Sequence, residues 1–134
     1  MFVLDCSVSA SWCLRDETND EAAAILRHLD SGTAMVPGLW VIEMANVMTV
    51  AERRKRISPA DAERAVQLLL ELPIHVEPAD VFHLRRVRNV AREYGLSAYD
   101  GAYLELAQRR GLALASFDEA LLSAAHRSGV PVLA

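Results

Sequence analysis

Short apolar segments alternate with helical segments along the whole of this 134-residue chain. This alternation constrains the fold more than any other feature, because strands that alternate with helices predict an α/β sandwich with a mostly parallel central sheet. Some helix ends can be read directly: Ser58 is a predicted N-cap, and Gly95 and Gly111 are predicted C-terminal stops. The segments that we expect to be strands are residues 2–5, 34–36, 74–77, 112–115 and 130–133.

The segments between these strands are long enough for helices. In one of them, apolar side chains recur at helical spacing and are expected to face the core: Trp40, Met44, Val47, Met48 and Ala51. The expected helices cover residues 9–14, 19–30, 37–56, 58–72, 80–94, 97–110 and 117–127.

The composition fits one folded domain over residues 1–134. Hydrophobic residues make up 52% of the chain, which excludes a disordered protein, and no apolar run is long enough to span a membrane. The N-terminus lacks the basic region and cleavage site of a signal peptide, so we expect a cytoplasmic protein. The net charge of −4 argues against nucleic-acid binding driven by the overall charge of the protein, so any RNA binding would depend on local clusters of basic residues.

Four carboxylates stand at the ends of apolar segments or near the beginnings of helices: Asp5, Glu43, Asp100 and Asp118. The alternating fold can bring them to one rim, because sites in such folds gather beyond the carboxyl ends of strands. At one rim, the repulsion between two carboxylates about 4 Å apart would cost on the order of 4 kcal/mol at an effective dielectric near 20. A divalent cation, magnesium or manganese, would remove that cost, and phosphoryl chemistry is the usual work of such a site.

Each acid also has a structural explanation when taken alone. Asp5 fits a turn or a helix cap, and Glu43, at the edge of the buried face of its helix, fits a pair with an arginine. Residues 97–100 fit the acidic variant of the capping box, and Asp118 lies in a helical first turn, where any acid is favoured. These alternatives stay open for single residues. The set of four, ordered around an alternating fold, favours a functional site.

The chain resembles the PIN domain family at four places. Residues 1–7, with Asp5 and the small hydroxyl residue Ser7, are similar to the opening strand of that family. Residues 43–46 resemble its second acidic element, and residues 96–103 its third. Residues 112–121 resemble the fourth, with Ser116 where threonine is commoner. The spacing and length are similar to those of compact VapC-type toxins, over essentially the whole chain.

This resemblance implies a three-layer α/β sandwich with a mostly parallel five-stranded central sheet. It implies an endoribonuclease that depends on Mg²⁺ or Mn²⁺ and acts as the toxin of a type II toxin–antitoxin system, hydrolysing RNA phosphodiester bonds. It also implies a homodimer and an antitoxin protein that blocks the acidic pocket. By the same resemblance, the catalytic metal ligands, direct or through water, are Asp5, Glu43, Asp100 and Asp118, and polar groups of the pocket are Ser7, Asn46 and Ser116.

Two arginine clusters are candidates for contact with the RNA backbone. The first ends the helix of Glu43, where cations are also favoured by the helix dipole alone. The second lies on one face of the helix at residues 80–94, and a solvated face is the alternative explanation. The candidate residues are Arg53, Arg54 and Arg56 in the first cluster, and Arg85, Arg88 and Arg92 in the second.

Several alternatives remain for partners and function. Trp12, Trp40, Met44 and Met48 are expected in the core, but they could instead form an exposed patch for a second copy or an antitoxin helix. The main rival functions are a housekeeping RNA-processing nuclease of the same family and a catalytically silent module that binds RNA or protein. A nucleotide-binding fold is disfavoured because the chain has neither G-x-G-x-x-G nor a P-loop.

Overall fold

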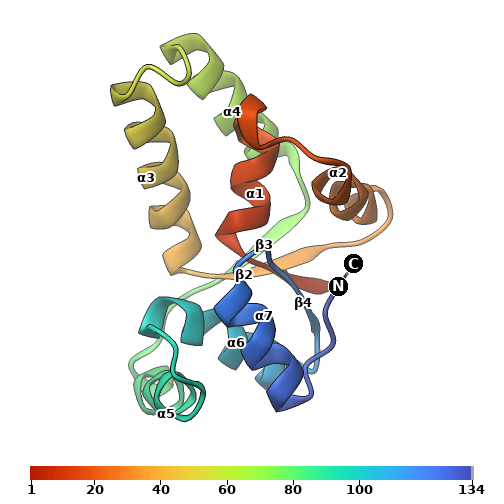
Figure 1. Cartoon of the computed structure of the whole chain (residues 1–134), viewed down its shortest axis with the longest axis vertical. Coiled ribbons are helices and arrows are strands. Elements are labelled where there is room, and N and C mark those ends of the chain that lie inside the picture. Colours follow the sequence, from red (N-terminus) through yellow and green to blue (C-terminus); the bar gives the residue numbers. More distant parts are fainter. Residues whose placement is uncertain (134) are drawn as a thin grey trace.

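A parallel sheet lies at the centre of the protein, with helices on both sides (Figure 1). The computed structural model describes residues 1–133, and within them the strands of the sheet follow the order β3-β2-β1-β4. All the pairings are parallel. This confirms the predicted α/β fold with its parallel sheet. The strands are β1 (Phe2–Leu4), β2 (Ala34–Pro37), β3 (Ile74–Glu77) and β4 (Ala113–Ala115).

The prediction of a fifth strand was wrong in detail. The segment at residues 130–133 lies beside β4, but it makes a single parallel bridge, between Val132 and Leu114. Leu114 donates to the carbonyl of Pro131 at 2.8 Å and accepts from the N–H of Leu133 at 2.9 Å. The next bond of a parallel ladder would need an N–H on Pro131, which proline lacks. On that side the pairing therefore stops at the bridge, and the sheet has four strands within residues 1–133.

Helices α1 to α4 gather on one side of the sheet and α5 to α7 on the other, which gives three layers (Figure 1). Three short 3₁₀ turns lie within or beside the helices predicted at residues 9–14, 19–30 and 80–94. These turns are Arg15–Glu17, His28–Asp30 and Val81–His83. The helices are α1 (Cys6–Cys13), α2 (Asp20–Arg27), α3 (Leu39–Arg53), α4 (Pro59–Glu71), α5 (Leu84–Tyr94), α6 (Ala98–Arg110) and α7 (Glu119–Ser128).

The core is built on β1 and on helix α6. Val3 and Leu4 of β1 are fully buried, as are Tyr103 and Leu104 of α6. Burying side chains of this size stabilises the fold by about 1.5–3 kcal/mol each. The predicted core face of α3 is confirmed for Trp40, Met44, Met48 and Ala51, whereas Val47 is half-buried. Trp12, on α1, is also half-buried.

Gly101 allows α6 to approach α5 closely. A Cβ atom at this position would lie 3.1 Å from the Cβ of Ala91, closer than side chains normally come. The absence of a side chain therefore sets the distance between the two helices. Because Gly101 directly follows Asp100, this contact also holds the first turn of α6 against α5.

No helix within residues 1–133 combines the length and the apolar composition that crossing a membrane requires.

Candidate active site

Asp5 follows β1 directly and occupies the N-cap position of α1, but its side chain does not cap that helix. Its Oδ2 atom instead accepts two hydrogen bonds, from the Ser7 hydroxyl at 2.6 Å and from the Ser116 hydroxyl at 2.8 Å. The residue is only 5% exposed. Burial raises the pKa of the Asp5 carboxyl above its usual range, and the two serine hydroxyls and the N–H groups of Cys6 and Ser7 oppose that rise.

The same two serines connect Asp5 to the turn between β4 and α7. The Ser7 hydroxyl oxygen accepts from the N–H of Phe117 at 2.9 Å, and the Ser116 hydroxyl oxygen accepts from the N–H of Asp118 at 3.0 Å. Each hydroxyl therefore donates to the carboxylate and accepts from the backbone. The ends of β1 and β4 are neighbours in the sheet, so this network fixes the relative positions of the Asp5 and Asp118 segments.

Asp118 is the N-cap of α7, as the sequence allowed. Its Oδ1 atom accepts from the N–H of Leu121 at 2.8 Å. Asp100 lies in the first turn of α6, where its own N–H donates to the Ser97 hydroxyl at 3.1 Å. Asp118 thus caps its helix through one carboxylate oxygen, whereas at Asp100 the bond to the Ser97 hydroxyl forms only the serine half of the capping box.

Glu43 is half-buried on α3 and is held by a residue that the sequence did not identify. The hydroxyl of Tyr103 donates to Glu43 Oε1 at 2.6 Å. The alternative for Glu43, a pair with an arginine, is not formed within residues 1–133. A signal for Tyr103 did exist, because it lies three residues after Asp100 and so shares a face of α6 with that acid.

The acids act on one another electrostatically. Burial raises the pKa of Glu43 above its usual range, the Tyr103 hydrogen bond lowers it, and the charges of Asp5 and Asp100 raise it further. Burial also raises the pKa of Asp100, followed by the charges of Asp118 and Asp5, while the Ser97 hydroxyl opposes the rise. Asp5 thus interacts with Glu43 and Asp100, and Asp100 with Asp118. Pairwise interactions thus connect the predicted acids, and a shared metal site at these residues stays a prediction.

Magnesium or manganese fits this group by its chemistry. Within residues 1–133, none of the four carboxylates has an ion-pair partner, so no positive side chain offsets their mutual repulsion. No three His, Cys, Asp or Glu side chains in this part of the chain converge tightly enough to enclose an ion. Mg²⁺ does not need such a cage, because it keeps several waters and binds through one or two carboxylates and the phosphates of a substrate.

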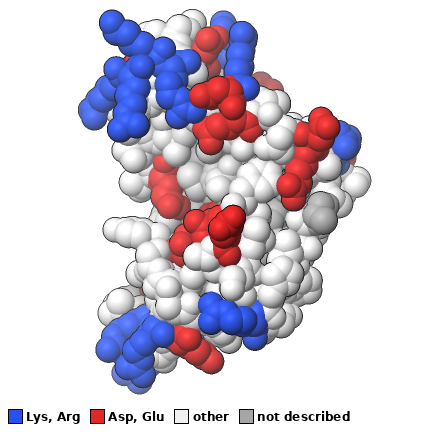
Figure 2. All heavy atoms as spheres, viewed as in Figure 1, with Lys and Arg blue, Asp and Glu red and all other residues white. Residues whose placement is uncertain are grey.

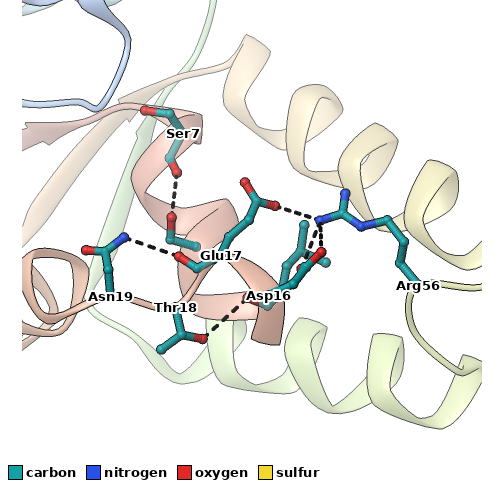
Figure 3. Close-up of polar contacts among 8 residues, drawn as sticks. Ser7, Asp16, Glu17, Thr18, Asn19 and Arg56 are labelled. Carbon is teal, nitrogen blue, oxygen red and sulfur yellow. Dashed lines mark hydrogen bonds and ion pairs between the residues drawn. The ribbon is translucent and has the colours of Figure 1, made fainter.

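The remaining predicted residues lie farther out on the surface. Asn46 is exposed on α3, and its place in the pocket stays a prediction. Arg56 is held by two acids of the turn after α1, with its Nη2 2.8 Å from Asp16 Oδ2 and 3.2 Å from Glu17 Oε2 (Figure 3). The other candidate arginines are exposed: Arg53, Arg54, Arg85, Arg88 and Arg92.

One face of the protein carries acidic side chains between two basic regions. Acidic side chains gather near the middle of the face shown in Figure 2. Basic side chains cover α5 toward one end of that face and the turn between α3 and α4 toward the other. The charge pattern along the long axis is therefore positive, negative and positive, which a net charge of −4 does not reveal.

A second group of charged side chains, around the buried Glu105, was not predicted from the sequence. Glu105 is 4% exposed, and its two oxygens accept from Arg109 at 2.7 Å and 3.2 Å. Arg109 also donates to Glu77 Oε1 at 2.6 Å, and Arg110 Nε lies 3.5 Å from Glu77 Oε2. The spacing of Glu105 and Arg109 at i and i+4 was visible in the sequence, but their burial was not.

Comparisons with known proteins agree with this architecture. The family model described as "PIN domain" matches residues 2–127. No curated protein matches the chain. Among solved structures, PAE2754 from Pyrobaculum aerophilum is 24% identical, with a TM-score of 0.70 over 92% of this chain and 83% of that one.

Two further similar structures are a toxin–antitoxin complex and a toxin. A toxin–antitoxin complex from Klebsiella pneumoniae is 17% identical, with a TM-score of 0.62 over 88% of this chain and 87% of the other. VapC20 of Mycobacterium tuberculosis, a sarcin-ricin loop cleaving toxin, is 15% identical, with a TM-score of 0.65 over 92% of this chain and 95% of the other. At these identities the likenesses show a shared fold.

Proposed function

Since the chain belongs to the PIN domain family, we propose that it is a divalent-metal-dependent endoribonuclease and the toxin of a type II toxin–antitoxin system. The observation that carries the proposal is the coupled group of four acids, Asp5, Glu43, Asp100 and Asp118. Three of them have raised pKa values, with burial as the first cause in each. The cleavage of RNA by VapC20, which shares the fold, supports RNA as the substrate.

The protein's own residues hold the acids in place before any substrate arrives. The Ser7 and Ser116 hydroxyls hold Asp5, and the cap of α7 holds Asp118. A bound Mg²⁺ or Mn²⁺ would neutralise the approaching phosphate and polarise the phosphorus. A carboxylate of the group, such as Glu43 or Asp100, can accept the proton of the attacking water as a general base.

The two basic regions supply candidate contacts for the RNA backbone on either side of the acids (Figure 2). We assign this role first to Arg53 and Arg54 at one end and to Arg85, Arg88 and Arg92 at the other. Arg56 is the weaker candidate of its cluster, because Asp16 and Glu17 already neutralise its guanidinium. Phosphate contacts of this kind fix the register of a strand and carry no sequence information.

Two exposed apolar regions supply candidate surfaces for an antitoxin and for a second copy in a homodimer. Val41 and Leu70 flank a groove of about 370 Å³ between α3 and α4. Val81, Phe82 and Leu84 are exposed where α5 begins. The toxin–antitoxin complex from Klebsiella pneumoniae supports an antitoxin partner for this chain as well. With RNA as its substrate and an antitoxin as its regulator, the protein would act in the cytoplasm.

Cleavage of total cellular RNA, with magnesium and with a chelator, tests the proposal. The wild-type chain should cut RNA only when the cation is present, and Asp100→Asn should cut at least about 100-fold more slowly because it loses a ligand and a base. Asp61→Asn is the matched control, since Asp61 occupies the same position after Ser58 that Asp100 occupies after Ser97.

The control variant should cut RNA at the wild-type rate. If a folded Asp100→Asn protein also cuts at that rate, the assignment of the site is wrong. Growth arrest on expression of the wild type, but not of Asp100→Asn, is the result expected of a toxin. Cleavage without growth arrest would favour a housekeeping nuclease instead.

A further inference from the structure

The largest side chain that is fully buried belongs to Tyr103, and its hydroxyl ends at the acidic group. Tyr103 is 0% exposed, and its hydroxyl donates to Glu43 Oε1 at 2.6 Å. A buried tyrosine hydroxyl needs a partner, because leaving it unpaired costs free energy. Here that partner is a carboxylate 60 positions away in the sequence, and not a backbone carbonyl of its own helix.

This hydrogen bond joins the two helical layers of the protein. Glu43 lies on α3, on one side of the sheet, and Tyr103 lies on α6, on the other (Figure 1). Tyr103 is also three residues after Asp100, so one face of α6 carries both an acid of the group and the residue that holds another acid. Helix α6 thereby sets the positions of Asp100 and Glu43 together.

The donor is neutral, and this matters for what Glu43 can bind. An arginine in the same place would neutralise Glu43 and compete with a bound cation. The tyrosine hydroxyl stabilises the carboxylate, leaves its negative charge intact and occupies a single oxygen, Oε1. Glu43 is therefore fixed in orientation while it still repels Asp5 and Asp100.

We propose that Tyr103 is a positioning residue, whose hydroxyl fixes the Glu43 carboxylate so that its second oxygen can bind the divalent cation. This inference rests on the proposed function, because it takes Glu43 as a metal ligand. Groups that hydrogen-bond to metal ligands in this way typically contribute 10- to 100-fold to metal affinity.

Calorimetric titration of the metal-free chain with Mn²⁺ tests the proposal without any activity assay. Tyr103→Phe keeps the ring in the core and removes only the hydroxyl, so it should bind Mn²⁺ about 10- to 100-fold more weakly than the wild type. Tyr94→Phe removes the same atom at the end of α5, where the Arg127 guanidinium lies over the ring, and should bind like the wild type. Thermal melts of the metal-free variants show whether each is folded.

A double-mutant cycle with Glu43→Gln separates positioning from a general loosening of the fold. If Tyr103 acts through Glu43, then Tyr103→Phe should lower Mn²⁺ affinity little further once Glu43 has become Gln. An equal loss in both backgrounds would overturn the proposal. If Tyr103→Phe does not fold, Tyr103→Met, a flexible apolar replacement, should give the same weakened binding.

The titrations distinguish a failure of this inference from a failure of the proposed function. If Tyr103→Phe binds Mn²⁺ as tightly as the wild type while Asp100→Asn does not bind, the positioning role is wrong and the metal site stands. If the wild type itself takes up no Mn²⁺, or Asp100→Asn binds as tightly as the wild type, the proposed metal site is wrong and the positioning role falls with it.

Discussion

A group of acids lies at each end of helix α6. The two groups differ in whether an arginine pairs with the acids. At the beginning of α6, Asp100 joins Asp5, Glu43 and Asp118, and none of these four has an ion-pair partner within residues 1–133. Toward its end, Arg109 lies between Glu105 and Glu77, 2.7 Å from one and 2.6 Å from the other. We call these the acidic group and the paired group.

The pKa values respond in opposite directions. In the paired group, burial raises the pKa of Glu77, but the Arg109 hydrogen bond and the charges of Arg109 and Arg110 outweigh burial and leave it below its usual range. In the acidic group, burial and neighbouring negative charge leave Glu43 and Asp100 above theirs. Acids whose charge is balanced within the fold stabilise it, whereas acids left unbalanced are available to bind a cation.

Removing the cation from the paired group should have the largest effect on stability. Arg109→Met leaves the buried Glu105 and the largely buried Glu77 without their shared partner, which should lower the free energy of unfolding by about 3 kcal/mol. Denaturation in urea measures this loss. Arg110→Met is the control: Arg110 is 47% exposed and 3.5 Å from Glu77, so its loss should cost less than about 1 kcal/mol. An unchanged midpoint for Arg109→Met would mean that the paired group contributes nothing to the fold.

Removing an acid from the acidic group should have the opposite effect and raise the stability of the metal-free protein. Asp100→Asn relieves repulsion, so the metal-free protein should be more stable, by about 0.5 kcal/mol after screening by solvent. The wild type should gain about 2.7 kcal/mol from Mn²⁺ supplied at 100 times its dissociation constant, and the variant should lose that gain. Thermal melts with and without Mn²⁺ measure both quantities. A destabilised metal-free variant would show that Asp100 is structural.

The two groups should also make opposite contributions to the pH dependence of stability. Acids whose folded pKa is raised bind more protons in the folded state, so Asp5, Glu43 and Asp100 destabilise the metal-free protein as pH rises above the ordinary carboxyl range, near pH 4. Glu77, whose folded pKa is lowered, contributes stability that is present above that range and is lost as pH falls below it.

Each group should therefore change stability by at most about 1.4 kcal/mol per pH unit for each acid that titrates. Melting temperatures of the metal-free protein should rise as pH falls toward 4 and then decline (~4 being the ordinary carboxyl pKa). Asp100→Asn should flatten the rise and leave the decline in place. A profile that Asp100→Asn does not alter would contradict the coupling between the acids.

The smallest expected effects concern the basic regions beside the acidic group. Arg54→Ala and Arg85→Ala should each weaken RNA binding and reduce the slope of log affinity against log salt by about 1, if each contacts one phosphate. Arg64→Ala is the control, since Arg64 is exposed and paired with Asp61. Filter binding of RNA to the Asp100→Asn protein over a range of salt concentrations measures the slopes. Equal salt slopes in all three variants would mean that neither basic region contacts the RNA backbone.

Much of the fold and of the acidic group could be predicted from local patterns. Asp5 and Asp118 follow neighbouring parallel strands, so their meeting at one edge of the sheet follows from strand order. The prediction failed at residues 130–133, where one bridge forms and Pro131 lacks the N–H that would extend it on one side. It also missed Tyr103, because the pattern of apolar residues marks a tyrosine as core without saying what its hydroxyl will meet.

Glu77 shows what sequence could not decide. It ends β3 as Asp5 follows β1, and by strand position alone it is an equally good candidate for the acidic group. The sequence by itself determined the alternating fold, the helix caps and the edge at which acids would gather, because these follow from periodicity and from residues close in the chain. Only the tertiary structure decided which acids receive an arginine and which are left to repel one another. That depends on which side chains α6 brings within about 3–4 Å, where the interaction between charges is strongest.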